Sequence, residues 1–310
     1  MSKRIRNFLI IAAVLIVVGG VVSGIGFALG GMIPVSIGGG GIHVAGQGER
    51  NTVVDESFRN LSSVEINTDI LELELRQGDA FRLEGTYDAS AVTLDISESG
   101  GGLRIDSRSA SSGFFGWNWG FGNFGFNTTV NKLVLTYPAD TGFDSVSIKN
   151  DLGSLKIDGL STKSLRAQLD AGYFKGSNIS ADTVDVDMNL GGCDITGLVV
   201  NNTTKFKMDA GSLNLIDSSL KDPDIKLNLG GFDYSGALNG SGRLTLDLGS
   251  LNLDLTNKEA DLGYDIATDL GSINMNGRGL GSPVSTRSDT REATYLNIKC
   301  NLGSVDIDTK

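Results

Sequence analysis

Cysteine, histidine and proline are all scarce in this sequence, and each shortage excludes a class of protein. The two cysteines, Cys193 and Cys300, are too few for a disulfide framework. The single histidine, His43, excludes His-based catalytic triads and metal sites with several histidine ligands. Only 4 prolines stand against 43 glycines in 310 residues, which argues against a Pro-rich disordered chain and for many turns between short strands.

Positive charge is also in short supply beyond the N-terminus. The net charge is -11, and residues 1–50 carry +3, which leaves -14 for the remainder of the chain. So acidic a region would repel phosphates rather than release their counterions, and we therefore expect no nucleic-acid partner.

Catalytic signatures are missing as well. The sequence has no G-x-S-x-G motif, no phosphate-binding loop and no cluster of metal-ligand residues. We expect neither an enzyme nor a cofactor. A β-helix that binds or cleaves carbohydrate stays open as an alternative, because carboxylate pairs are common on any acidic surface.

One long apolar run is present near the N-terminus. Phe8 to Ile33 is a stretch of 26 residues without a charge, long enough for a helix that crosses a bilayer. It is longer than the apolar part of a secretory signal peptide, which is the alternative. Lys3, Arg4 and Arg6 precede the run, so the positive-inside rule predicts a cytoplasmic N-terminus and an extracytoplasmic C-terminal part.

These features predict four segments in a single-pass protein of the cell membrane. Residues 1–7 form a basic cytoplasmic tip, 8–33 a transmembrane helix, 34–50 a Gly-rich linker and 51–310 one extracytoplasmic domain.

A short motif recurs through that domain. It reads Asp or Asn, then Leu or Ala, then Gly, then a variable residue, and most copies lie 19–20 residues apart. The spacing widens to 22 and 32 residues at the last two copies. Its glycines are Gly153, Gly172, Gly191, Gly211, Gly230, Gly249, Gly271 and Gly303.

Apolar residues occupy fixed positions around this glycine. They stand five residues before it, immediately before it and two residues after it, as in Ile148, Leu152 and Leu155. The alternation before the glycine predicts a strand with one buried face, and this face includes the residue next to the glycine. After the glycine the apolar positions shift by one residue, which predicts a corner.

A unit of about 19 residues cannot bury its own apolar row, so the copies are expected to stack. The sequence therefore predicts an all-β fold, a β-solenoid with coils of 19–20 residues, regular from about residue 146. A two-sheet sandwich is the alternative. Val64 to Leu75 resembles a degenerate ninth copy, and further strands are expected at Phe81–Gly85, Val92–Ile96, Leu103–Ile105 and Leu133–Tyr137.

The D-L-G-S copies at Asp151, Asp247 and Asp269, their Asn and Ala variants and the preceding apolar run resemble a bacterial family of unknown function. This is the "putative adhesin" or β-strand-repeat family, and the resemblance covers roughly residues 60–310. It implies an extracytoplasmic β-helix-like domain and, in some members, a link to cell-envelope stress. It implies no catalytic residues.

The acidic position of the motif has two interpretations. The aspartates could form a row of cation sites, since carboxylates one coil apart repel unless they are bridged. Alternatively, Asp and Asn could serve the tight turn, which is the interpretation we favour. The weak metal candidates are Asp151, Asp170, Asp209, Asp247 and Asp269.

The segment 111–127 is the one feature that the repeat does not require. It interleaves aromatic residues with Gly and Asn and carries no charge, so it could be a loop folded over the solenoid or an exposed patch for a membrane, sugar or protein. Its candidate partner-binding residues are Phe114, Phe115, Trp117, Trp119, Phe121, Phe124 and Phe126.

Together these patterns predict a non-enzymatic binding or scaffold protein of the cell envelope. It would attach to the membrane through its N-terminal helix and meet a protein or glycan partner outside. An accessory subunit of another membrane protein is a further alternative.

Overall fold

The computed structural model describes residues 35–38, 41–44, 51–89, 92–109, 131–279, 284–287 and 294–310. The chain divides into two compact units, residues 1–48 with 117–128 and residues 49–116 with 129–310. The first contains a short antiparallel hairpin of β1 (Val35–Gly38) and β2 (Gly41–Val44), inside the segment predicted as a linker.

Three predicted segments lie outside the described residues, namely the cytoplasmic tip 1–7, the membrane span 8–33 and the aromatic segment 111–127. In the part of the chain that the structure describes, no helix has both the length and the apolar character to cross a membrane.

The second unit is all-β, as predicted, and begins with seven strands of mixed direction. They are β3 (Asn51–Ser57), β4 (Ser63–Ile70), β5 (Glu72–Gly78), β6 (Arg82–Asp88), β7 (Val92–Ser99), β8 (Gly102–Ser109) and β9 (Lys132–Pro138). Antiparallel pairs join β3 to β6, β6 to β9 and β7 to β8, while β4 pairs with β8 and β5 with β9 in parallel. The strands expected from alternation in this region are therefore confirmed.

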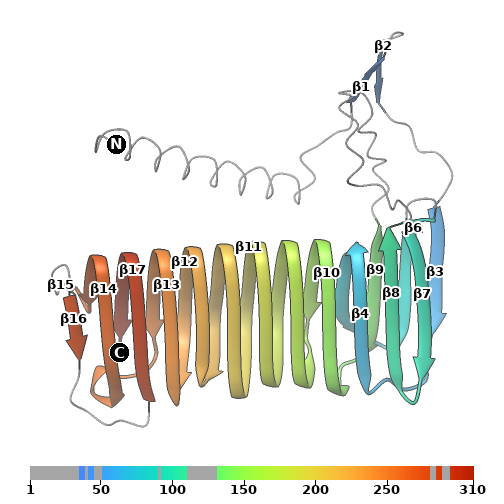
Figure 1. Cartoon of the computed structure of the whole chain (residues 1–310). Helices are drawn as coiled ribbons and strands as arrows, with labels where there is room; N and C mark the ends of the chain where they lie inside the picture. The colour runs from blue at the N-terminus through green and yellow to red at the C-terminus, as the bar shows by residue number, and fades with distance from the viewer. Residues whose placement is uncertain are drawn as a thin grey trace. The chain divides into compact units, whose positions relative to one another are not determined.

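The rest of the unit is a row of parallel coils (Figure 1). Their strands are β10 (Gly142–Asp158), β11 (Ser161–Lys221), β12 (Pro223–Asn239), β13 (Ser241–Leu255), β14 (Leu262–Met275) and β17 (Thr294–Thr309). Strand β11 covers 61 residues because the pairing runs on through the corners of successive coils. Each motif residue pairs with its equivalent, as Gly153 does with Gly172, so the solenoid prediction is confirmed and the sandwich is excluded.

The degenerate ninth copy is also confirmed. Strands β4 and β5 pair with β10 in parallel and in the register of the motif, with Ile70 opposite Leu152. We call the coil of β4 and β5 the first-end coil. The eight glycine coils are numbered in spatial order away from it, so the coil of Gly153 is the first glycine coil.

Glycine is required at the corner because the coils approach one another there through their backbones. A Cβ added to Gly191 would lie 1.7 Å from the carbonyl oxygen of Gly172, and the other motif glycines meet a neighbouring carbonyl oxygen at 1.6–2.2 Å. Most of them also have φ between +138° and +159°, where side chains are strained. This stack of glycines is the glycine ladder.

The last coils do not follow the order of the sequence. Strand β17 pairs with β13 on one side and with β14 on the other, so the C-terminal copy is the seventh coil and the Gly271 copy is the eighth. The outer side of β14 pairs antiparallel with β15 (Arg278–Gly279) and β16 (Val284–Arg287). Sequence order had implied the reverse arrangement of these two copies.

The two cysteines are free and fully buried in the core. Cys193 stands two residues after its glycine, where the other copies have an apolar residue, and Cys300 stands three residues before its glycine. They belong to the third and seventh coils, four coils apart rather than the five that sequence order implies, or roughly 19 Å along the stack. Burial raises the pKa of both thiols.

The core runs the length of the coils and becomes polar at its two ends. Three residues before the glycine, the middle coils bury Leu169, Met188, Met208, Leu227, Leu246 and Cys300. The same position holds Thr68 and Asn150 at one end and Thr268 at the other. Asn150 donates a hydrogen bond from Nδ2 to the carbonyl oxygen of Leu71 at 2.9 Å, where the glycine ladder begins.

Candidate binding surface

At five of the eight motif glycines the residue immediately before the glycine is an exposed leucine, which corrects the expectation that this position joins the buried face; Ala210, at the same position in the fourth coil, is buried. Leu190 is 50% exposed, Leu302 46% and Leu270 65%. The inward row stops three residues before the glycine and resumes two residues after it, so the four residues between them form the outside of the corner.

These residues form one continuous stripe along the stack, because equivalent positions pair from coil to coil, and within β11 the glycines beside them stack in the same order. We call it the leucine ladder. In spatial order it consists of Ile70, Leu152, Ala171, Leu190, Ala210, Leu229, Leu248, Leu302 and Leu270. Alanine replaces the larger side chain at the second and fourth coils, so large and small side chains alternate along the first half of the stripe. We call the alanine positions low positions.

The Asp/Asn column beside the ladder is a chain of hydrogen bonds between coils. Each asparagine donates from Nδ2 to Oδ1 of an aspartate in the neighbouring coil over 2.9–3.0 Å: Asn189 to Asp170, Asn228 to Asp209 and Asn301 to Asp247. Amides thus separate the carboxylates in these coils, and no bridging cation is needed there.

The five weak metal candidates do not gather into a site. Asp170, Asp209 and Asp247 are separated by the asparagines, Asp269 is set apart from Asp247 by Asn301, and Asp151 forms an ion pair with Lys149 at 3.3 Å. Among the described residues, no group of three or more His, Cys, Asp or Glu side chains could hold a metal ion.

A second column of the same kind lies on the other side of the corner, three residues after the glycine. Its asparagines donate to neighbouring aspartates at 2.5, 2.5 and 3.2 Å: Asn214 to Asp194, Asn252 to Asp233 and Asn274 to Asp306. The Tyr173 hydroxyl also donates to Asp194. The sequence interpretation missed this column.

The two columns alternate out of phase. From the third coil to the eighth, each coil carries one aspartate and one asparagine, and the aspartate changes sides at every coil. We call these carboxylates the acidic rim. In spatial order they are Asp194, Asp209, Asp233, Asp247, Asp306 and Asp269.

The alternation depends on where β17 lies. In sequence order Asp269 would follow Asp247 directly, one coil apart, whereas Asn301 stands between them in the structure. Like charges so close repel, so the inserted strand spaces the carboxylates of one column about 9.6 Å apart. The alternation itself was the signal in the sequence that could have revealed the order.

In the second column the first two coils carry lysines, Lys156 and Lys175, in place of rim carboxylates. Lys156 and Lys132 bind the carboxylate of the buried Glu74 at 2.9 and 2.8 Å. Hydrogen bonds from Lys132 and then Lys156 lower the pKa of Glu74 to about 2. This cluster joins β5 to β9 and β10.

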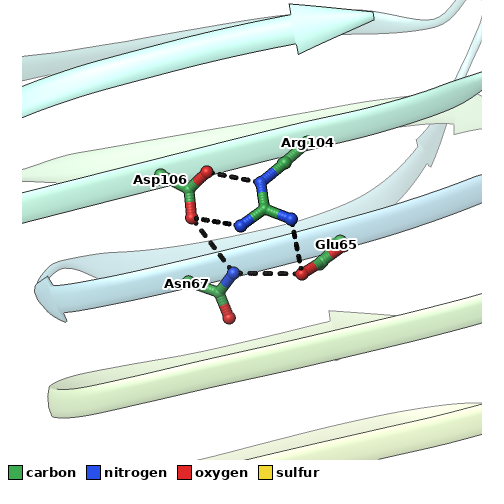
Figure 2. A network of polar contacts seen from close by, with 4 residues as sticks. All are labelled: Glu65, Asn67, Arg104 and Asp106. Carbon is green, nitrogen blue, oxygen red and sulfur yellow. Dashed lines mark hydrogen bonds and ion pairs between the residues drawn. The ribbon is translucent and has the colours of Figure 1, made fainter. Parts of the chain in front are cut away.

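A second polar cluster lies on β4 and β8 (Figure 2). Arg104 contacts Asp106 at 2.6 Å and Glu65 at 3.1 Å, and Asn67 donates to both carboxylates. Arg104 is half-exposed, so the cluster joins two strands on the surface and presents no unpaired charge.

A hollow in the described surface lies across the fifth to seventh coils. It measures about 350 Å³ and is lined by Asp222, Pro223, Asp224, Ser241, Gly242, Arg243, Tyr295 and Asn297. Carboxylates, a guanidinium and a tyrosine ring thus face one open space.

Three solved structures resemble the chain. A "putative adhesin" from Bacteroides fragilis has a TM-score of 0.36 and 12% identity, covering 85% of this chain and 98% of that one. A "putative cell adhesion protein" from Clostridium sporogenes has a TM-score of 0.29 and 10% identity, covering 84% and 100%. A "putative lipid binding protein" from Parabacteroides distasonis has 0.29 and 15%, covering 84% and 97%.

No curated protein was found to match the chain. A family model does match, over residues 61–308, which span the first-end coil and all eight glycine coils. The stacked motif, the glycine ladder and this match lead to one conclusion: the chain belongs to the Toastrack DUF4097 family.

Proposed function

We propose that this protein is a non-enzymatic binding scaffold of the cell envelope, in which the coils present the leucine ladder to a protein partner. The observation that carries the proposal is the ladder itself. Large aliphatic side chains stand 38–65% exposed at six of its positions, from one end of the stack to the other. Contiguous exposed apolar surface of this kind marks interaction sites in soluble domains.

Folding alone does not account for leucine at this position. The residue points away from the core, and the neighbouring position, one residue earlier, accepts Asp or Asn in every coil. A polar side chain would fit the same corner and lose only the part of the leucine that the neighbouring coils cover. Binding gives the exposed leucines a reason that packing does not.

The proposal includes the membrane anchor predicted at residues 8–33, with the coils outside the cell. Lys3, Arg4 and Arg6 support this orientation. Protease added to intact cells is expected to digest the domain, and protection until the cells are lysed would contradict the orientation. A role in envelope stress fits the family resemblance and belongs to the same proposal.

Photo-crosslinking from the ladder tests the function directly. A crosslinker at position 190 in intact cells is expected to give a defined protein adduct, and Leu248→Ser in the same chain is expected to abolish it. Position 199 is the matched control, because Val199 is 41% exposed and lies off the ladder. The same adducts from both positions, or none from position 190, would contradict the proposal.

A second candidate function is carbohydrate binding at the hollow beside Tyr295. A tyrosine ring with Arg243, Asp222 and Asn297 offers the stacking and hydrogen-bonding groups that sugars use. A glycan array with the intact chain and Arg243→Ala tests it, and an array with no hit would reject it.

The aromatic segment 111–127 stays a predicted contact for either partner. Deleting residues 113–126 is expected to weaken binding and leave the thermal transition unchanged.

A further inference from the structure

The charge beside the leucine ladder determines what chemistry its partner needs. From the third coil to the eighth, the two flanking columns contain only Asp and Asn, and asparagine neutralises no charge. Among the described residues, Lys207 is the one cation within 4.0 Å of a rim carboxylate, and its Nζ lies 4.0 Å from Asp209 but 3.1 Å from Asp187. An apolar stripe with carboxylates on both sides therefore faces solvent.

The spacing along the stack adds a second constraint. On either side of the ladder a carboxylate recurs every two coils, or about 9.6 Å. Seven residues of an α-helix rise about 10.5 Å, so positions one heptad apart on a helix nearly match this spacing. Strand residues on one face recur every ~6.8 Å, which matches neither one coil nor two.

The ladder has the same period in its first half. Ala171 and Ala210 leave low positions between Leu152, Leu190 and Leu229, so low positions also recur every two coils. The apolar seam of an amphipathic helix could place one side chain per heptad in each low position, in the manner of knobs in holes. A helix of roughly 25 residues would span the whole ladder, which is about 38 Å long.

We propose that the leucine ladder binds a basic amphipathic helix of a partner protein, with the apolar seam on the ladder and Lys or Arg side chains on the acidic rim. The inference rests on the proposed function and names the partner's chemistry. A second copy of this chain would bring rim against rim, and an anionic membrane would also be repelled.

Binding of designed peptides to the full-length chain in zwitterionic nanodiscs provides the test, with empty nanodiscs subtracted. The probe is a 25-residue helical peptide, roughly the ladder length at 1.5 Å per residue, with a leucine seam flanked by lysines. One control replaces the lysines with glutamates, and a second scrambles the order so that the seam is lost. We expect only the basic seam peptide to bind, with affinity that falls as salt rises.

Variants separate the ladder from the rim. Leu190→Ser with Leu248→Ser is expected to weaken binding at least ~10-fold. The double variant Asp209→Asn with Asp247→Asn keeps the acceptor oxygens for Asn228 and Asn301 and removes two charges. We therefore expect the fold to persist, while binding weakens ~5-fold or more and depends less on salt. Val199→Ser is the control that leaves binding unchanged.

The outcomes also separate this inference from the proposed function. In one outcome, a partner crosslinks in a ladder-dependent way but binds equally well after the Asp209 and Asp247 substitutions. That result would support the scaffold function and contradict the basic helix. Equal binding of the glutamate peptide, ladder-dependent self-association in sedimentation, or ladder-dependent binding to phosphatidylglycerol vesicles would overturn it too. Loss of both the adduct and peptide binding would reject the two proposals together.

Discussion

The N-terminal strands β3–β9 and the glycine coils β10–β17 are held together in different ways. The N-terminal strands mix directions and rely on individual contacts, such as the ion pairs of Arg104 and of Arg82 with Asp55 at 2.8 Å. The coils repeat one set of contacts, with glycine against glycine and asparagine against aspartate. Irregular contacts suit an end that must stop the stack, whereas repeated ones let each coil template the next.

The junction between the two regions is well defined. Phe143, in the first glycine coil, packs edge-on against Tyr137 at 5.2 Å and Phe81 at 6.4 Å between ring centroids. Glu74 and its two lysines add a polar contact at the same junction. If the contrast between the regions is correct, perturbing the repeated contacts will cost more than perturbing the individual ones.

The largest effect is expected from removing β17. A chain that ends at residue 293 loses an inner coil, including buried Leu296, Ile298 and Val305. We expect the melting temperature to fall by at least ~15 °C, or cooperative unfolding to be lost, in a calorimetric scan. Strand β14 could close the gap only by placing Asp269 beside Asp247. Deleting Lys310 alone is the control, and a truncated chain that melts like the control would mean that β17 is not an inner coil.

Next in size is an alanine in the glycine ladder. Gly191→Ala places a Cβ against the carbonyl oxygen of Gly172, which cannot move without separating two coils. We expect a loss of about 4 kcal/mol or more in the free energy of unfolding, measured by denaturant titration. Gly142→Ala, where a Cβ meets no atom within 4 Å, is expected to change it by less than ~1 kcal/mol. Equal effects of both substitutions would refute the ladder as a packing constraint.

A smaller, pH-dependent effect is expected from Glu74→Gln at the junction. Because the pKa of Glu74 in the folded chain is about 2, below its ordinary 4.5, the ionised carboxylate stabilises the fold above pH 4.5. That contribution is lost as the pH falls from 4.5 through 2. We expect the variant to lose about 1–3 kcal/mol at neutral pH, since both lysines are partly screened by solvent.

Denaturant titrations of both chains at several pH values check this expectation. The two stability curves should converge as the pH approaches 2, where Glu74 is protonated in the parent chain. Parallel curves over that range would show that the lysines do not stabilise the ionised form.

The smallest effect is expected from Arg104→Ala in the N-terminal region. Its partners Glu65 and Asp106 are 49% and 28% exposed, so solvent screens the ion pairs. We expect a loss of less than ~1 kcal/mol that diminishes further in high salt. A loss as large as that of Gly191→Ala would erase the proposed difference between the two regions.

Much of this architecture follows from the sequence because its causes are local. A glycine every 19–20 residues with alternating neighbours determines a strand, a corner and a stack, and it also places Cys193 and Cys300 in the core. The leucine next to the glycine was misassigned, because alternation is a property of strands and four corner residues interrupt it. The same rule therefore located the core and concealed the candidate binding surface.

The order of the last two coils was decided by the tertiary structure. Spacing along the chain records how residues are connected, whereas the free edge of β13 accepts whichever strand pairs best. With β17 there, aspartates alternate with asparagines, and polar Thr268 comes to the end of the core where it interrupts no apolar contact. The sequence by itself determined the coil, its corner and its buried rows, because these depend on neighbours along the chain. The position of each coil and the outward turn of its leucine depend on charges and contacts between coils, and only the folded stack brings those together.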